Sequence, residues 1–362
     1  MINGRKKRLI LLMMICVFLL GTLSGCGDKK GSESKSQEST NVTQENDDNV
    51  QESTGTAEPV EEEAVTLRVG ALKGPTTMGL LFLMEDQKAG KTKNSYEFQM
   101  ATGADELLPL MVSGKLDVAL VPANVAAILY QKTEGGVAVV DVNTLGVLYL
   151  VSSDPDVKGI GDLKGRTIYL TGKGTTPDCV LQYLLKGAGY QEGEVTLEYK
   201  SEATEVAAIL AEKEDALGFL PQPFVTAACL QNEKLSIVLS ANDAWMEQQD
   251  GTEKNGLVTG VTVVRREILE KYPNAINTFL EEHAASAKAI NEDPDTGASL
   301  AVAAGIVGKE PIAKKAIPNC NITCLTGEEM KKALQSYLEI LYDFDKTTVG
   351  GKLPGEDFYF VK

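Results

Sequence analysis

Short apolar runs alternate with amphipathic segments along most of this chain. The apolar runs are typical of buried strands, and the amphipathic segments between them are typical of helices. Strands followed by helices across short loops predict an α/β fold, with mostly parallel sheets flanked by helices. The expected strands are 66–72, 96–102, 117–122, 137–142, 147–153, 166–170, 195–200, 216–221 and 235–241, and the expected helices are 76–88, 104–114, 124–133, 178–189, 205–213 and 224–232.

The pattern changes after residue 257. Residues 257–269 begin as an apolar run and end as an amphipathic segment, so a strand that enters a helix is expected there. From that point to residue 345 the chain is predicted to be helical, with breaks at Pro273, at Pro294 and across 311–318. The span 65–362 exceeds what one hydrophobic core usually holds, and two domains are therefore expected.

The first residues have the features of an export signal. Basic residues at positions 5–8 precede an apolar stretch at 9–20, which is too short to span a bilayer comfortably. The segment ends in Leu23-Ser24-Gly25-Cys26, which resembles the bacterial lipoprotein box. The resemblance implies that residues 1–25 are a signal peptide and that Cys26 is lipidated. The lipid would then anchor the protein to the outer face of the cell membrane.

An acidic, polar segment at 26–63 follows the signal. It is almost free of large apolar residues and is expected to be a disordered tether. The total charge is −16; because the signal carries four basic residues and the tether three lysines against eleven acids, −12 remains on the rest of the chain. An acidic domain without a basic patch argues against nucleic acid as a partner.

The thiols and the single histidine limit the chemistry of the chain. His283 has no partner at metal-ligand spacing, so no metal, no cofactor and no catalytic residue is expected, and its polar helical setting predicts a solvated side chain. The spacing of Cys320 and Cys324 fits either a local disulfide or free thiols. Cys179 and Cys229 lie in apolar helical stretches and are expected to be buried thiols.

Two lysine–glycine turns, at 73–77 and 173–177, each follow a strand and precede a helix. The second turn departs from both nucleotide-binding patterns, since Thr167 replaces the first glycine of a P-loop and Pro177 the last glycine of a dinucleotide fingerprint. Two interpretations remain. The turns are capped loops, or they are anion-friendly turns that face a shared cleft beyond the carboxyl ends of the strands.

Four segments resemble the ABC-transporter substrate-binding proteins of the nitrate, sulfonate, taurine and thiamine-precursor family. The segment 147–190 contains Asp162-Leu163-Lys164-Gly165 followed by a glycine-rich loop and a helix, and the other segments are 218–228, 244–295 and 347–360. Together the likeness covers residues 65–362. It implies the two-lobed, type II periplasmic-binding-protein-like fold. Lobe one would comprise 65–150 plus 257–362 and lobe two 154–253, with hinges near 151–153 and 255–259.

The resemblance also implies a ligand in the cleft between the lobes. In the second lobe, Gln222 stands where the family often has an acidic residue, and Trp245 would either line the cleft or pack beside it. Threonine hydroxyls and backbone N–H groups are expected to hold an oxyanion, with the lysines adding charge. The candidate ligand-binding residues are Lys73, Pro75, Thr76, Thr77, Thr102, Gly103, Pro122, Ala123, Asn124, Lys173, Gly174, Thr175, Thr176, Pro221, Gln222, Phe224 and Trp245.

These features predict an extracytoplasmic, monomeric lipoprotein that captures a small anionic or heteroaromatic solute and delivers it to an ABC permease. An enzyme of pyrimidine or quinone metabolism on the same scaffold is one alternative, although the shortage of histidine and the export signal argue against it. A sensor lipoprotein without a transport role is another. A neighbouring permease gene would distinguish the sensor from the transport protein.

Overall fold

The computed structural model describes residues 65–250, 252 and 254–361. The signal peptide, Cys26 and the tether lie outside the described residues, so the expectations for them stay predictions. Within the described part of the chain, no helix has both the length and the apolar character needed to cross a membrane.

Six strands form the first sheet: β1 (Thr66–Leu72), β2 (Ser95–Ala101), β3 (Val118–Pro122), β4 (Val137–Leu145), β10 (Val258–Arg265) and β11 (Ile322–Leu325). Their order is β11–β4–β10–β3–β1–β2. β1 pairs parallel with β2 and β3, whereas β10 is antiparallel to β3 and β4, and β11 is antiparallel to β4. Every residue of β3 is buried, which accounts for its continuous apolar run.

Five strands form the second sheet: β5 (Leu148–Ser152), β6 (Thr167–Thr171), β7 (Thr196–Lys200), β8 (Leu217–Pro221) and β9 (Ser236–Ser240). Their order is β7–β6–β8–β5–β9. β6 pairs parallel with β7 and β8, and β5 pairs antiparallel with β8 and β9. The strand–helix alternation thus produces a parallel portion in each sheet, as expected, and the strands near the two crossings run antiparallel.

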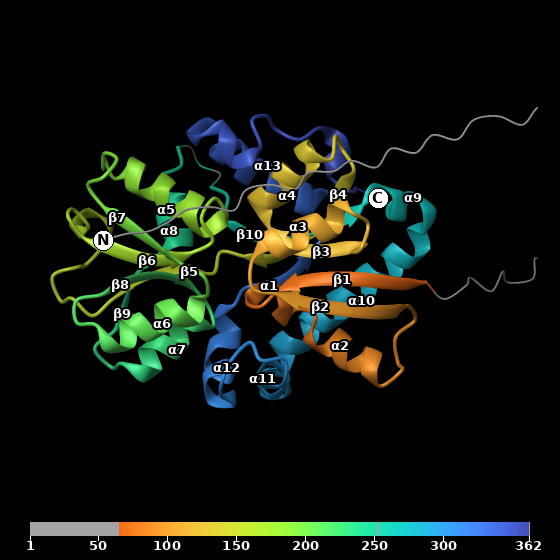
Figure 1. Cartoon of the computed structure of the whole chain (residues 1–362), viewed down its shortest axis with the longest axis horizontal. Helices are drawn as coiled ribbons and strands as arrows, with labels where there is room; N and C mark the ends of the chain where they lie inside the picture. Colours follow the sequence, from red (N-terminus) through yellow and green to blue (C-terminus); the bar gives the residue numbers. More distant parts are fainter. Residues whose placement is uncertain (1–64, 251, 253, 362) are drawn as a thin grey trace, which may run out of the picture. The chain divides into compact units, whose positions relative to one another are not determined.

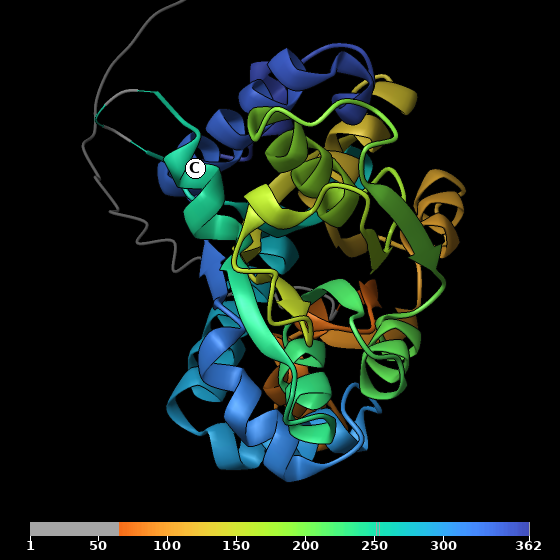
Figure 2. The same ribbon diagram turned by 90° about the vertical axis from the view of Figure 1, so that its left-hand side faces the viewer.

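Helices cover both faces of each sheet (Figure 1). In the second sheet, α5 (Thr176–Gly187) and α8 (Ala241–Glu247) lie on one face, and α6 (Ala203–Glu212) and α7 (Phe224–Gln231) on the other. The remaining helices are α1 (Pro75–Met78), α2 (Leu81–Lys88), α3 (Ala104–Val112), α4 (Ala123–Lys132), α9 (Arg266–Lys271), α10 (Pro273–Glu292), α11 (Pro294–Ala303), α12 (Glu310–Ala316) and α13 (Gly327–Phe344). Figure 2 shows α13 (dark blue) at the opposite end from α11 and α12 (lighter blue).

The chain crosses from the first sheet to the second at Gly146 and Val147. The N–H of Leu145 still donates to Asn321 of the first-sheet side (3.1 Å), whereas the carbonyl of Val147 already accepts from the N–H of Gln222 (3.1 Å). The crossing therefore precedes β5, and residues 148–150 pair within the second sheet instead of belonging to lobe one. The sequence placed the crossing later, at 151–153, because the apolar run of β5 does not reveal which sheet it joins.

Both crossing segments contact the side chain of Asn242. Its Oδ1 accepts from the N–H of Leu257 (2.9 Å) on the return crossing. A Cβ atom added at Gly146 would lie 2.6 Å from that same oxygen and 2.7 Å from Cβ of Asn242. The close approach of chain and side chain explains a glycine at the first crossing.

We expect Gly146→Ala to destabilise the protein by about 1–3 kcal/mol, because the added methyl group forces the Asn242 side chain and its backbone to move. Urea denaturation measures this loss. Gly161→Ala is the matched control, since a Cβ there would meet nothing within 4 Å. Equal stability of the two variants would show that the Asn242 side chain moves aside without an energetic cost.

The four cysteines of the described chain are free. Of the two possibilities for Cys320 and Cys324, the structure therefore has free thiols. Cys179 is buried, as expected, whereas Cys229 is only half-buried. Burial raises the pKa of the Cys179 thiol to about 12, so this sulfur is a protonated, inert part of the core.

His283 is fully buried, and the expectation of a solvated side chain is wrong. Along α10, Phe279, His283, Ala287 and Ile290 recur every three or four residues, and all of them are buried. This spacing places them on one stripe of the helix that faces the core. The polar residues that flank His283 in the sequence obscure this stripe.

Candidate functional site

A cavity of about 500 Å³ lies where the carboxyl ends of strands from both sheets meet. The turn after β1 and the turn after β6, which resemble each other in sequence, both contribute to its wall. The sequence-predicted residues that line it are Lys73, Pro75, Thr76, Thr102, Gly103 and Pro122 from the first-sheet side, and Lys173, Thr175, Thr176, Pro221 and Phe224 from the second-sheet side. The fold thus brings most of the candidate residues together.

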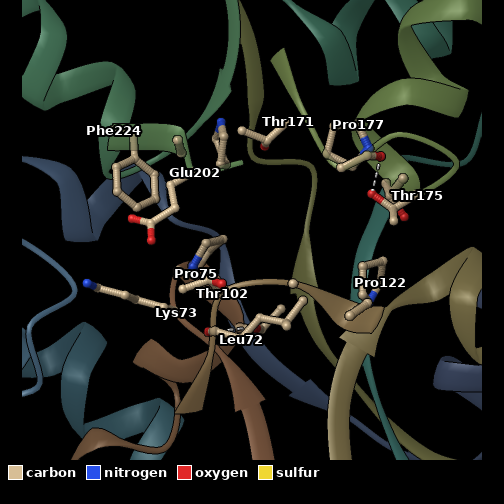
Figure 3. A pocket seen from close by; sticks show the side chains of 18 of the residues that line it. Leu72, Lys73, Pro75, Thr102, Pro122, Thr171, Thr175, Pro177, Glu202 and Phe224 are labelled. Atoms are coloured by element: carbon tan, nitrogen blue, oxygen red, sulfur yellow. Dashed lines mark hydrogen bonds between the residues drawn. The ribbon is translucent and has the colours of Figure 1, made fainter. Parts of the chain in front are cut away.

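Apolar groups form much of the cavity wall. The ring of Phe224 is 7% exposed and stands at the start of α7. Figure 3 shows this ring and the side chain of Glu202 on one side of the cavity, with Pro177 across from them and Pro75 below. A partly exposed aromatic ring together with proline rings gives the wall an apolar section that suits an apolar surface on a ligand.

The threonine hydroxyls at the cavity donate their hydrogens inside the protein. Thr76 donates to the carbonyl of Leu72 (3.3 Å), and Thr175 donates to that of Gly172 (2.6 Å). A hydroxyl has one hydrogen to donate, so these groups face a ligand mainly as acceptors. This arrangement weakens the expectation that they hold an oxyanion.

The glycine-rich turn before α5 already holds a carboxylate. The N–H of Gly174 donates to Oδ2 of Asp178 (2.7 Å), and the same side chain accepts from Gln182 (2.6 Å) and from the Tyr199 hydroxyl (2.7 Å). Asp178 is 3% exposed. Burial, followed by the bond to Asp178, raises the pKa of Tyr199 above its usual value, so the phenol stays a donor. The anion that this turn attracts therefore comes from its own helix.

The start of α3 is occupied in the same way. Oε1 of Glu106 accepts from the hydroxyl of Thr102 (2.7 Å) and from the N–H groups of Thr102 (2.9 Å) and Gly103 (3.1 Å). The bond from the hydroxyl, and then those from the backbone, lower the pKa of Glu106, which remains an anion. Both helix ends at the cavity thus carry an internal negative charge.

Asn124 and Thr176 form a seam between the two sheets behind the cavity. Asn124 is fully buried, and its Nδ2 donates to the carbonyls of Gly174 (3.0 Å) and Thr348 (3.1 Å). The hydroxyl of Thr176 lies 3.3 Å from Oδ1 of Asn124, and the hydroxyl of Tyr337 lies 3.3 Å from that of Thr176. Asn124 therefore serves the contact between the lobes and does not line the cavity.

Gln222 and Trp245 are two further candidates that do not line the cavity, and both side chains are buried. Gln222 is 3% exposed, and its Oε1 accepts from the hydroxyl of Thr226 (2.8 Å). Trp245 is fully buried, and its ring centroid lies 4.5 Å from that of Tyr183 and 5.4 Å from that of Tyr337. Of the two expected positions, Trp245 therefore packs beside the cleft and does not line it. The residues outside the lining are Thr77, Ala123, Asn124, Gly174, Gln222 and Trp245.

Sequence reasoning missed one whole section of the wall. The segment Ser201–Thr204 follows β7 and lines the cavity, as does Asp105 at the start of α3. The carboxyl-end rule would have found this segment, because it occupies the same place after β7 as the recognised turn does after β6. The lining therefore contains two acids, Asp105 and Glu202, and two lysines, Lys73 and Lys173. The charged groups of the lining balance, and the cavity is not a positive pocket.

The lysines themselves are exposed. The Lys173 ammonium lies 5.4 Å from the ring centroid of Tyr199, on the second-sheet side. In Figure 3 the Lys73 side chain extends away from Leu72 and Thr102. Both lysines stand at the rim of the cavity, where water screens their charge.

We expect Asp178→Ala to lower the free energy of unfolding by about 2–4 kcal/mol, because the N–H of Gly174 and the hydroxyl of Tyr199 lose their shared acceptor. Chemical denaturation measures the loss. Asp156→Ala, at an exposed acidic position, is the control and should stay within about 0.5 kcal/mol of the unchanged protein. An Asp178→Ala variant as stable as this control would mean that the turn does not depend on its carboxylate.

Two mixed α/β sheets that share a cavity at their strand ends define the fold of periplasmic binding proteins. Solved structures share this fold. An ABC transporter protein from Parabacteroides distasonis is 24% identical, with a TM-score of 0.67 over 82% of this chain and 99% of that one. The aliphatic sulphonate binding protein SsuA from Escherichia coli is 15% identical, with a TM-score of 0.62 over 80% and 92%. The nitrate-binding protein NrtA from Synechocystis PCC 6803 is 12% identical, with a TM-score of 0.58 over 79% and 84%.

A family model described as NMT1/THI5 like matches residues 95–297, more than half of the chain. The chain belongs to this family, which agrees with the resemblance seen in its sequence segments. None of the curated proteins compared with the chain matches it.

Proposed function

We propose that this protein is the extracytoplasmic substrate-binding lipoprotein of an ABC importer and carries no catalytic activity. The observation that supports this role best is the cavity, which is built from the carboxyl ends of strands in both sheets. The export signal and the lipoprotein box at Cys26 support a place on the outer membrane face. Proteins of the same fold include the sulphonate- and nitrate-binding proteins named above.

In this proposal the two sheets are the cores of two lobes. Lobe one comprises about 65–146 and 257–361, and lobe two about 147–250. The crossings at Gly146 and before Leu257 are the hinges, and Asn242 lies between them. Closure on a solute would favour the form that docks on the permease. The protein acts as a monomer.

Of the two solute classes expected from the sequence, the wall favours a flat heteroaromatic molecule over an inorganic anion. The hydroxyls of Thr76 and Thr175 donate internally, and Asp178 and Glu106 occupy the helix ends. Phe224 contributes part of an aromatic ring to the wall. The threonine oxygens and Glu202 can accept hydrogen bonds from ring N–H or amino groups.

A thermal-shift panel of nitrate, taurine, cytosine and riboflavin tests both the role and the class. A solute present at 100 times its Kd stabilises the protein by about 2.7 kcal/mol. Stabilisation by the ring compounds alone would support the proposal as a whole. Stabilisation by nitrate or taurine would retain the role and change the class, and a broad panel without effect would argue against the role.

An enzyme on the same scaffold is the principal alternative. Among the described residues that line the cavity there is no histidine and no cysteine, so the wall does not carry a Ser-His or Cys-His pair. Mass spectrometry of small molecules that co-purify with the protein separates the two functions. A binding protein releases its solute unchanged on denaturation, whereas an enzyme yields a converted product on incubation.

A further inference from the structure

A buried cluster of three different side chains lies outside the cavity wall. It consists of Asp141 on β4, His283 on α10 and Cys324 on β11, which are distant in sequence but adjacent in the fold. One donor atom from each lies within 4.8 Å of the others. Asp141 and His283 are fully buried, and Cys324 is partly buried.

The carboxylate and the thiol both face the same ring nitrogen. Nδ1 of His283 lies 3.2 Å from Oδ2 of Asp141 and 3.9 Å from Sγ of Cys324. A catalytic Cys-His-Asp arrangement needs the thiol and the carboxylate on opposite ring nitrogens, so that one orients the base and the other loses its proton. This geometry therefore does not build a nucleophile.

The same convergence is what a metal ion requires. Bonds of about 2.0 Å to nitrogen and oxygen and 2.3 Å to sulfur place tetrahedral ligands of zinc about 3.3–3.5 Å apart. The nitrogen–oxygen separation is 3.2 Å, the nitrogen–sulfur separation is 3.9 Å, and the oxygen and the sulfur lie within 4.8 Å of each other, so small shifts of the side chains would bring all three atoms to bonding distance. Imidazole, thiolate and carboxylate together are a zinc-type donor set. One divalent ion would also neutralise the carboxylate and the thiolate, whose burial as free charges is costly.

The carboxylate is oriented by neighbours in the manner of a metal ligand. The hydroxyl of Thr262 donates to Oδ1 of Asp141 (2.8 Å), and Nδ2 of Asn143 donates to the hydroxyl of Thr262 (3.2 Å). This chain leaves Oδ2 directed at His283. Hydrogen-bond partners of this kind commonly hold metal ligands in position and tune the affinity for the metal.

We propose that Asp141, His283 and Cys324 form a three-ligand zinc site that joins β4, α10 and β11. The partly buried Cys324 would give the ion its access. The expectation from the sequence was that no metal binds, because no second ligand lies near His283 in the sequence. The fold supplies two ligands from other elements instead.

Elemental analysis of the full chain, purified without a metal-binding tag and dialysed after exposure to zinc, tests the site. We expect about one zinc per chain in the unchanged protein and at least a tenfold loss in Cys324→Ser. Cys320→Ser is the matched control, because its thiol is buried four residues away and contacts Met78 and the carbonyl of Ala316. This control should keep its zinc.

Cobalt substitution gives a second readout that does not depend on the stability of a variant. A cobalt–thiolate site absorbs through sulfur-to-metal charge transfer, so the band should appear in the unchanged protein and in Cys320→Ser but not in Cys324→Ser. Absence of both zinc and this band from the unchanged protein would overturn the proposal. Zinc retention or a cobalt band that persists in Cys324→Ser would overturn it as well.

Discussion

Replacing Phe224 with alanine should weaken solute binding by about 5- to 30-fold, which corresponds to a loss of about 1–2 kcal/mol. Phe224 lines the cavity at the start of α7 and is 7% exposed, so a solute removes only a small area of its ring from water, and the specific contact with the aromatic ring supplies most of the effect. Calorimetric titration with the compound found in the thermal-shift panel measures the change. Phe224→Leu keeps most of the apolar volume and should lose only the aromatic contribution, about fivefold.

Val225→Ala is the matched control for Phe224. Val225 follows Phe224 in α7 and is 1% exposed, and both belong to the same cluster of the second-sheet core, but Val225 does not line the cavity. The control should therefore lose stability and keep its affinity. Equal affinity in Phe224→Ala and in the unchanged protein would mean that the solute does not contact this wall.

The sequence predicted the elements that depend on local pattern. The strand β1 has the expected bounds, and the parallel strands β6–β8 follow the expected alternation, because buried strands between amphipathic helices leave a clear period. The two lysine–glycine turns were found for the same reason and meet at one cavity. Antiparallel pairing of β5 has no such local signal, since strand direction depends on partners far along the chain.

The parts of the site that the sequence did not reveal involve partners at long range. Asp178 is visible as a residue of a first helical turn, but its bond to Tyr199 on β7 is a tertiary contact. Asn124 has the position of a ligand contact, yet it bonds to Thr348 near the chain end. Asp141 and His283 meet only because α10 packs on the first sheet. Side-chain types predict what a residue can do, and the fold decides which partner it has.

Asn124→Asp should destabilise the protein more than Asn124→Ala, although aspartate has nearly the same shape as asparagine. The Nδ2 group donates to two carbonyls, of Gly174 and Thr348, in a fully buried position. Alanine leaves these acceptors without a donor and costs about 2–4 kcal/mol. Aspartate would turn a carboxylate oxygen toward both carbonyls, which adds repulsion and the cost of a buried charge.

Urea denaturation at neutral pH ranks these variants. Gln131→Ala is the control, because Gln131 lies on the same helix α4 and donates a comparable bond to the carbonyl of Lys352 (3.0 Å) at an exposed position. Its loss should cost about 0.5 kcal/mol. Since Gly174 belongs to the second-sheet side and Thr348 to the first, the Asn124 variants should also loosen the junction between the lobes. Hydrogen exchange would report this loosening as faster exchange in the turn before α5. An Asn124→Asp variant as stable as the unchanged protein would show that Asn124 does not hold the two lobes together.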